Sequence, residues 1–421
     1  KPKRSRLRAL SQGFYSTMEE PSSKDDSPRV LKVLEALKQA SHQLQSHPSP
    51  NSEELNSSSA IKALLELETE SDAILSKDPN LSSLSHHLSD LKALVENLQK
   101  SGGHHGLKSF LARRASTHSI SRVAGSIESE IQAWIDRESI DTLTRVLREQ
   151  PFDNEVELIK LLSQFEDRVS QGFNRELQDL VLKSKLFSLL ESNLCNPNCS
   201  KRIRESCAFA IGALTRFNKD VFVGQVLMGP TIGSLVTMAS SASIRVLCSL
   251  IRSIKSPLVD EIESNGEIPK IISFLSHQDL EIQVLGMDCV LEIGYFGRKE
   301  AIEAMLREGL IKKLVELQRS ELGGDLIDMG RYGSGDGKEN EGVGAGGLEG
   351  NRESREKRFL ESHPFASCVA RFAVQLEVGE GLRQRERRAF KQEILVRVRE
   401  TCVSDAEAAT IVAEVLWGSS P

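Results

Sequence analysis

The chain has 421 residues, 5% of them aromatic, and its 54 Lys and Arg against 60 Asp and Glu give a net charge of −6. This acidic balance argues against a general binder of phosphate backbones, because such binding depends on a surplus of basic residues. Few aromatic side chains with abundant Leu, Ile, Val, Ala and Ser favour stacked helices with aliphatic cores over a β-sandwich. We therefore expect an all-α protein that does not bind nucleic acid.

Residues 1–28 are polar and predict a disordered leader and linker. The first 17 of them include five basic residues and no acid, as in an organelle transit peptide or a basic localisation patch. The alternative, which we prefer, takes Met18 as the natural start, because a transit peptide begins at its own Met.

Residues 29–150 predict a helical bundle. Apolar side chains recur at three- and four-residue steps over 29–45, 59–75 and 81–99, which indicates three amphipathic helices. A long fourth helical segment is expected over 107–150. It contains Arg113-Arg114-Ala115-Ser116, which spells a basophilic kinase site, so Ser116 is a candidate phosphosite.

A repeat becomes visible downstream of Asn154. Gly266 and Gly309 each precede a similar helical pattern. Three further blocks can be superimposed on one another: 204–216 and 245–255 upstream of Gly266, and 284–295 between the two glycines. The step is constant at 40 residues, which is typical of armadillo and HEAT solenoids. The superimposed apolar pairs are Ala210/Ile211, Leu250/Ile251 and Val290/Leu291. The sequence therefore predicts a right-handed armadillo-type α-solenoid over 154–421.

The last repeat contains an insertion, residues 323–351, with eleven glycines among its 29 residues. Such a segment buries too little apolar area to offset its ordering entropy, so we expect it to be disordered. Helices over 383–399 and 406–417 are expected to cap the stack, with a polar outer side. That outer side would be provided by Arg385, Arg387, Arg388 and Arg397.

No motif predicts an enzyme, a cofactor or a metal. Neither G-x-S-x-G nor H-E-x-x-H occurs, and the Gly-rich spellings in the insertion lack the strand and helix that a phosphate loop needs. Cys195 and Cys199 have no further zinc ligands at a readable spacing, and His86 and His87 diverge on a helix. Most of the seven cysteines lie on apolar helical faces, which fits a reducing, intracellular compartment.

The Gly-x-Ile-Pro opening at Gly266, the 40-residue step and the Arg-Glu-Gly-Leu-Ile restart at Arg307 resemble plant armadillo-repeat proteins. The upstream segments VLEALKQASHQL and SIESEIQAWIDRES resemble the helical N-terminal domain of plant U-box ubiquitin ligases that also carry armadillo repeats. In that family a U-box lies between the bundle and the repeats. Here the repeats follow the bundle directly, so the resemblance implies the scaffold without the ligase module.

In a solenoid of this kind the inner helices are expected to line a groove. Arg252, Asp288 and Glu292 occupy inner-helix positions and are candidate partner-binding residues. Armadillo receptors of nuclear localisation signals, such as importin-α, place Trp and Asn there. Trp134 and Trp417 are the tryptophans of this chain, and both lie outside the inner helices. A receptor of that type is therefore not expected.

These observations predict a non-catalytic scaffold or adaptor that binds a protein partner along the groove. Two alternatives stay open: a component or regulator of ubiquitin ligation, and a membrane-associating helical bundle with a solenoid adaptor. No stretch predicts a transmembrane segment, because the longest uncharged run, 221–244, is interrupted by Gly and Pro. We expect a cytoplasmic location, with the nucleus as an additional one.

Overall fold

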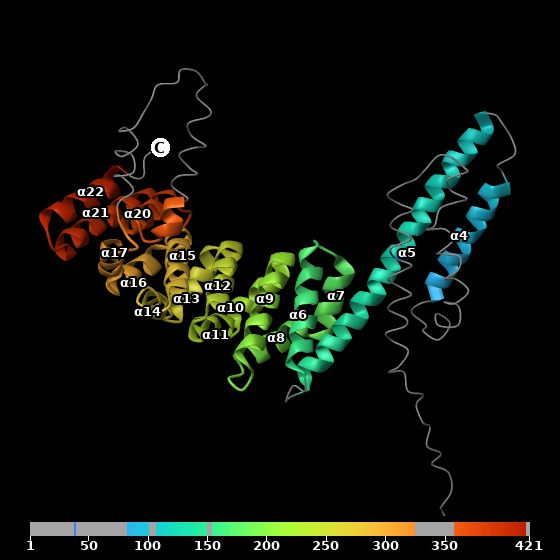
Figure 1. Cartoon of the computed structure of the whole chain (residues 1–421), viewed down its shortest axis with the longest axis horizontal. Coiled ribbons are helices and arrows are strands. Elements are labelled where there is room, and N and C mark those ends of the chain that lie inside the picture. The colour runs from blue at the N-terminus through green and yellow to red at the C-terminus, as the bar shows by residue number, and fades with distance from the viewer. Residues whose placement is uncertain (1–37, 39–81, 101–106, 150–153, 325–357, 418–421) are drawn as a thin grey trace, which may run out of the picture. The chain divides into compact units, whose positions relative to one another are not determined.

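The computed structural model describes residues 38, 82–100, 107–149, 154–324 and 358–417 (Figure 1). Within these ranges the regular structure is helical and contains no strand. The chain divides into two compact units, Lys1–Glu138 and Ser139–Pro421.

The first unit contains α4 (Ser82–Lys100) and the larger part of α5 (Leu107–Arg148). Both helices expected here, over 81–99 and 107–150, are present. Apolar side chains of each are buried, and His87 Nε2 on α4 lies 3.1 Å from Glu130 Oε1 on α5. The helices expected over 29–45 and 59–75 lie outside the described residues.

The boundary between the units lies inside α5, earlier than the 150–154 expected from the sequence. Residues 139–148 belong to the second unit, where Ile140, Leu143 and Leu147 enter its hydrophobic core. The carbonyl oxygen of Leu147 accepts a hydrogen bond of 3.2 Å from Nδ2 of the buried Asn193. The boundary shifts because the apolar stripe of α5 runs on into that core.

The second unit is built from three-helix repeats. In each repeat two short helices are followed by a third helix, and the third helices of successive repeats pack against one another. The packed helices are α6 (Glu155–Ser170), α9 (Lys201–Phe217), α12 (Ser241–Ile254), α15 (Leu280–Phe296) and α20 (Cys368–Val378). The other helices labelled in Figure 1 for this unit are α7 (Arg175–Ser184), α8 (Leu186–Cys195), α10 (Lys219–Met228), α11 (Thr231–Met238), α13 (Ser256–Ser264), α14 (Ile268–Phe274), α16 (Lys299–Arg307), α17 (Leu310–Arg319), α21 (Gln384–Thr401) and α22 (Asp405–Trp417).

We call α6, α9, α12, α15 and α20 the inner helices. Each packs against the next one in this order, so they form one continuous row (Figure 1). Hydrogen bonds between repeats recur at a separation of 40 residues, as between Ser241 and Glu281 and between Ser256 and the carbonyl of Phe296. The predicted 40-residue step is therefore a physical repeat, and the unit is an all-α solenoid of the armadillo type.

The core of the solenoid is aliphatic and follows the predicted apolar pairs. Five of their six members are buried, and Leu291 is half-buried. Two glycines of α15 allow close helix approach: a Cβ on Gly286 would lie 2.7 Å from Cβ of Phe274, and one on Gly294 would lie 3.0 Å from the ring of Phe372. A larger residue at Gly286 would force α14 and α15 apart, and one at Gly294 would require the Phe372 ring to shift.

The helices expected at the C-terminal end are α21 and α22. Arg385 and Arg388 are exposed, as predicted, but the prediction for Arg387 and Arg397 was wrong. Both are half-buried: Arg387 donates to three backbone carbonyls around the end of α20, and Arg397 Nη1 donates to the Leu306 carbonyl at 2.9 Å. The reason is that the last carbonyls of a helix lack intrahelical partners and attract cationic donors.

The structure describes the first two residues of the predicted insertion. Gly323 and Gly324 are held in place, because the Gly323 N–H donates to the Ser320 carbonyl and the Gly324 N–H to the Gln318 carbonyl, both at 2.9 Å. The Ser367 N–H in turn donates to the Gly324 carbonyl, so the chain leaves and returns at neighbouring points. Residues 325–351 lie outside the described residues.

Candidate partner-binding surface on the inner helices

Two helix starts set the register of the central inner helices. At the beginning of α12, Ser240 and Ser243 exchange side chain–backbone hydrogen bonds in a capping box. At the beginning of α15, the Asp279 carboxylate accepts from the Glu281 N–H at 2.9 Å. These caps fix which residues of each helix turn away from the core.

The first predicted pair of site residues meets across the two helices. Arg252 Nη1 on α12 lies 3.4 Å from Glu292 Oε1 on α15, which is one 40-residue repeat further along the chain. The Arg252 side chain is 60% exposed and that of Glu292 is 22% exposed, so the ion pair is open to solvent on the arginine side. Burial raises the pKa of Glu292, and Arg252 opposes that shift.

Asp288 lies one turn before Glu292 on α15. Its side chain is exposed to solvent, yet burial among neighbouring protein atoms raises the pKa of the carboxyl. Both observations fit a side chain that water reaches from one direction while the flanking helices displace water elsewhere. Arg371 on α20 and then Arg252 on α12 lower the pKa of Asp288, so both cations lie close enough to act on this carboxyl. The three residues predicted from the sequence thus lie together.

Arg371 on α20 is a member of this cluster that the sequence prediction missed. It is half-buried, and its Nη1 donates to the Pro364 carbonyl at 2.6 Å. Burial lowers the pKa of Arg371, whereas Asp288 raises it. The apolar pattern of residues 364–376 matches that of the inner helices, and this pattern was the available signal for Arg371. It went unused because the insertion interrupts the 40-residue register.

The polar surface continues towards α6. Arg216 at the end of α9 donates from Nη1 to Ser249 Oγ on α12 at 2.9 Å. It also opposes the burial that raises the pKa of Glu166 on α6. Gly212, 40 residues before Arg252, lies next to this arginine, and a Cβ there would be in ordinary van der Waals contact with Arg216 Nη1 at 3.6 Å. We call Arg216, Arg252, Asp288, Glu292 and Arg371 the inner-helix surface.

The cysteines of the solenoid provide no activated thiolate near this surface. Cys207, Cys248, Cys289 and Cys368 are buried in the core, and burial raises the pKa of Cys368 to about 12. A thiol with a raised pKa is a poor nucleophile at neutral pH. Within the described residues no group of three or more His, Cys, Asp or Glu side chains could hold a metal ion.

Two further sequence predictions concern Ser116 as a phosphosite and the transmembrane segments. Ser116 lies within α5, in a stretch whose side chains are outside the described part of the molecule. None of the described helices is individually long and apolar enough to cross a membrane.

The chain matches no family model and no curated protein. A designed armadillo repeat protein, YIII(Dq)4CqI, is 12% identical with a TM-score of 0.39 and covers 66% of this chain and 99% of its own. A second designed armadillo protein, solved with the peptide (KR)4, is 15% identical with a TM-score of 0.37 and covers 65% and 99%. The fold assignment above rests on the helix contacts of the chain itself.

Proposed function

We propose that the solenoid is a protein-interaction scaffold that binds a segment of a protein partner across the inner-helix surface. One observation carries this proposal: charged side chains from α9, α12, α15 and α20 gather along the row of inner helices without entering the core. Asp288 makes no hydrogen bond or ion pair with any described residue, so its carboxylate is free to accept one from a partner.

The charges of this surface alternate in sign. Arg252 pairs with Glu292, Arg371 lies near Asp288, and Arg216 lies near Glu166. Each cation is therefore largely balanced by an anion on a neighbouring helix. A partner would be selected by matching donors to acceptors along the surface, and not by a high net charge. Such binding is expected to depend only weakly on salt.

The test compares two double variants of the full-length protein. In Arg252→Gln/Glu292→Gln the central ion pair is removed, whereas Arg245→Gln/Glu281→Gln removes another solvent-exposed pair between the same two helices, with a distance of 2.5 Å. We expect Arg252→Gln/Glu292→Gln to capture about tenfold less partner than the parent protein, because the loss of one or two polar contacts has an effect of this order. Quantitative affinity capture gives the measurement.

Both variants should melt within a few degrees of the parent protein, because exposed ion pairs add little stability. Equal capture by the parent and by Arg252→Gln/Glu292→Gln would remove the inner-helix surface from the proposal. Asp288→Asn should weaken capture without any change in the melting temperature.

A role in ubiquitin ligation is the second proposal, and the resemblance of the N-terminal helices supports it. The chain offers no room for a U-box between α5 and α6, because only residues 149–154 separate them. In this proposal the protein acts on a separate ligase, by presenting that ligase or its substrate. Ubiquitination of a captured partner, measured with and without this protein, tests the idea, and no difference between the two reactions would discard it.

A further inference from the structure

The helix α21 at the end of the solenoid is unusually basic for this acidic chain. It carries six basic and three acidic residues, although the whole protein has a net charge of −6. Its buried face, with Phe390, Ile394 and Val398, packs into the solenoid. The question is what its basic residues do.

Three of the six basic residues have structural partners. Arg387 donates to the carbonyls of Leu382, Glu377 and Gly379 at 3.0, 2.7 and 2.6 Å. Lys391 pairs with Glu377 at 2.9 Å, and Arg397 donates from Nη1 to the Leu306 carbonyl at 2.9 Å. These three side chains hold α21 on the solenoid and are not available to a ligand.

The other three are Arg385, Arg388 and Arg399, and they are exposed. Among the residues that the structure describes, no hydrogen bond or ion pair engages their side chains. With Gln392 and Val396, which are also exposed, they follow steps of three and four residues and therefore share one helical face. We call Arg385, Arg388, Gln392, Val396 and Arg399 the cationic stripe.

The acids of α21 do not neutralise this stripe. Glu386 accepts from the backbone N–H of Arg383 at 2.8 Å, and Glu393 is paired with Arg397. Glu400 is exposed beside Arg399 at the end of the helix. Val396, 50% exposed, adds an apolar contact between the arginines. The stripe therefore offers cations at both ends and an apolar side chain between them.

We propose that the cationic stripe is a second interaction surface, separate from the inner-helix surface, that binds an acidic segment of a protein partner. The guanidinium group matches a carboxylate with two parallel hydrogen bonds, so Arg at helical spacing fits Asp or Glu side chains. The stripe spans about 21 Å at 1.5 Å per residue, which suits a short linear segment. An apolar residue of the partner between its acids would contact Val396.

Two other anionic partners fit less well. A helix that lies in a membrane surface inserts its apolar face, but the apolar face of α21 is already packed in the solenoid core. A nucleic-acid duplex needs many phosphate contacts, and the acidic body of this chain opposes them. A protein segment requires only a few carboxylates at the right spacing.

The experiment uses the full-length protein with fluorescein-labelled octaglutamate as the probe, read by fluorescence anisotropy. The variant Arg385→Glu/Arg388→Glu/Arg399→Glu should bind the probe about tenfold more weakly, as expected from the loss of three exposed charge pairs. The matched control, Arg175→Glu/Arg202→Glu/Arg307→Glu, makes the same change in net charge at exposed arginines of α7, α9 and α16. It should change binding by no more than about twofold.

Parallel arms replace the probe with mixed phosphatidylcholine–phosphatidylserine vesicles and with a short DNA duplex. Stripe-dependent binding of octaglutamate that exceeds binding of either alternative supports an acidic protein segment. Three results overturn the proposal: no binding of octaglutamate by the parent protein, equal weakening by both triple variants, or stronger stripe-dependent binding of vesicles or DNA. The inner-helix variants Arg252→Gln/Glu292→Gln serve as an independent reference, because they leave the stripe intact.

Discussion

At the scale of single residues, arginines complete helix ends in this solenoid. Arg387 satisfies three carbonyls near the end of α20, and Arg204 and Arg397 do the same for single carbonyls at the ends of α8 and α16. Removing such a donor leaves partly buried carbonyls without partners, which costs more than the hydrogen bond itself contributes. We expect Arg387→Met, which keeps an apolar stem, to lower the free energy of unfolding by about 2 kcal/mol.

The control for this prediction is Arg388→Met on the same helix, because Arg388 is exposed. It should change the free energy of unfolding by less than about 0.5 kcal/mol. Denaturant unfolding monitored by circular dichroism gives both values. If the two substitutions cost the same, the carbonyl contacts of Arg387 do not stabilise the junction between α20 and α21.

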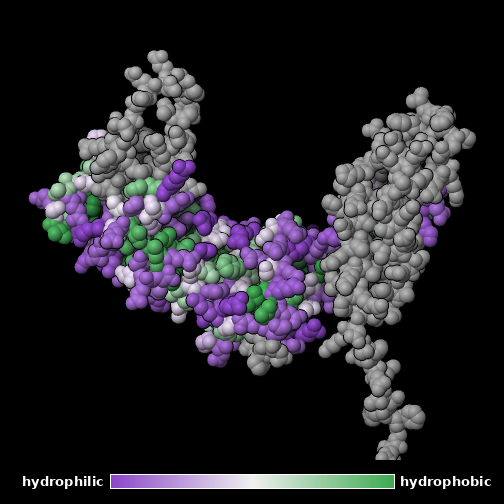
Figure 2. All heavy atoms as spheres, viewed as in Figure 1, coloured by the Kyte–Doolittle hydropathy of each residue, from purple (hydrophilic) through white to green (hydrophobic). Residues whose placement is uncertain are grey.

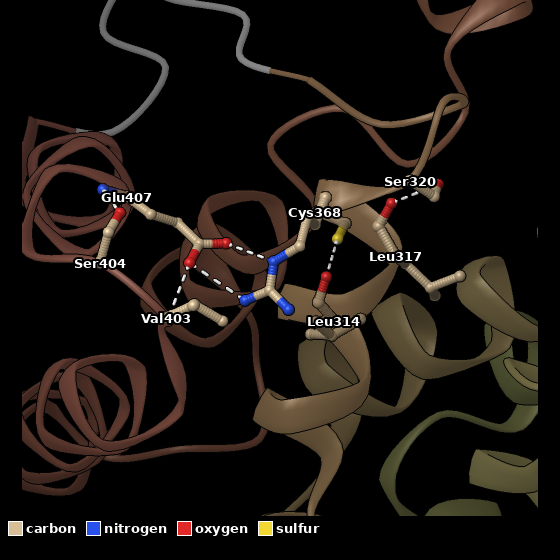
Figure 3. A network of polar contacts seen from close by, with 8 residues as sticks. Leu314, Leu317, Ser320, Cys368, Val403, Ser404 and Glu407 are labelled. Atoms are coloured by element: carbon tan, nitrogen blue, oxygen red, sulfur yellow. Dashed lines mark hydrogen bonds and ion pairs between the residues drawn. The ribbon is translucent and has the colours of Figure 1, made fainter.

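At the scale of elements, one polar network fastens the final helix α22 to α17 (Figure 3). Arg319 on α17 donates from Nε and Nη2 to the two carboxylate oxygens of Glu407 at 2.8 and 3.0 Å. Glu407 also accepts from the Val403 N–H at 2.9 Å, and its own N–H donates to Ser404 Oγ, so Ser404 caps α22 and Glu407 takes part in the same turn. The hydrogen bond from Arg319 is the main cause that lowers the pKa of Glu407.

This network makes the attachment of α22 sensitive to acid. A carboxyl with a lower pKa in the folded state stabilises the fold fully above its unfolded pKa of about 4.3, and the contribution is lost as the pH falls through the folded pKa. Amides of α22 should therefore lose hydrogen-exchange protection below about pH 4. In Glu407→Gln, protection should be lower at neutral pH and change less on acidification. Glu400→Gln, at an exposed position, should behave like the parent protein.

At the scale of the whole molecule, the period was predictable from sequence because each repeat must bury the same face against its neighbours. Ala210, Leu250 and Val290, which are 40 residues apart, all lie on that buried face. Contacts that join distant parts of the chain were not predictable: Arg397 reaches the carbonyl of Leu306 91 residues away, and Arg371 follows the insertion. In Figure 2 hydrophilic residues cover much of the solenoid face in view, and their hydropathy does not tell which of them make such contacts.

Part of the candidate site was also predictable from the sequence. Arg252 and Glu292 share the 40-residue register, so the sequence placed them on one face, and the structure joins them at 3.4 Å. Whether that face binds a partner stays a prediction. The unit boundary was not predictable, because α5 has no break between 138 and 139 and only tertiary packing distinguishes its two parts.

The boundary inside α5 leads to a prediction about how the two units are coupled. Leu143 on α5 is 1% exposed in the solenoid core, whereas Leu91 on α4 is 1% exposed in the first unit. Leu-to-Ala substitution at such positions costs about 2–5 kcal/mol. In a solenoid each repeat is stabilised mainly by its neighbours, so a loss at one end is felt most by the adjacent repeat. Leu143→Ala should therefore reduce hydrogen-exchange protection in α6, α8 and α9 more than in α15 or α20. Leu91→Ala should leave all five unchanged. If Leu143→Ala instead affects only residues before 139, the end of α5 belongs energetically to the first unit, and the boundary returns to the position expected from the sequence.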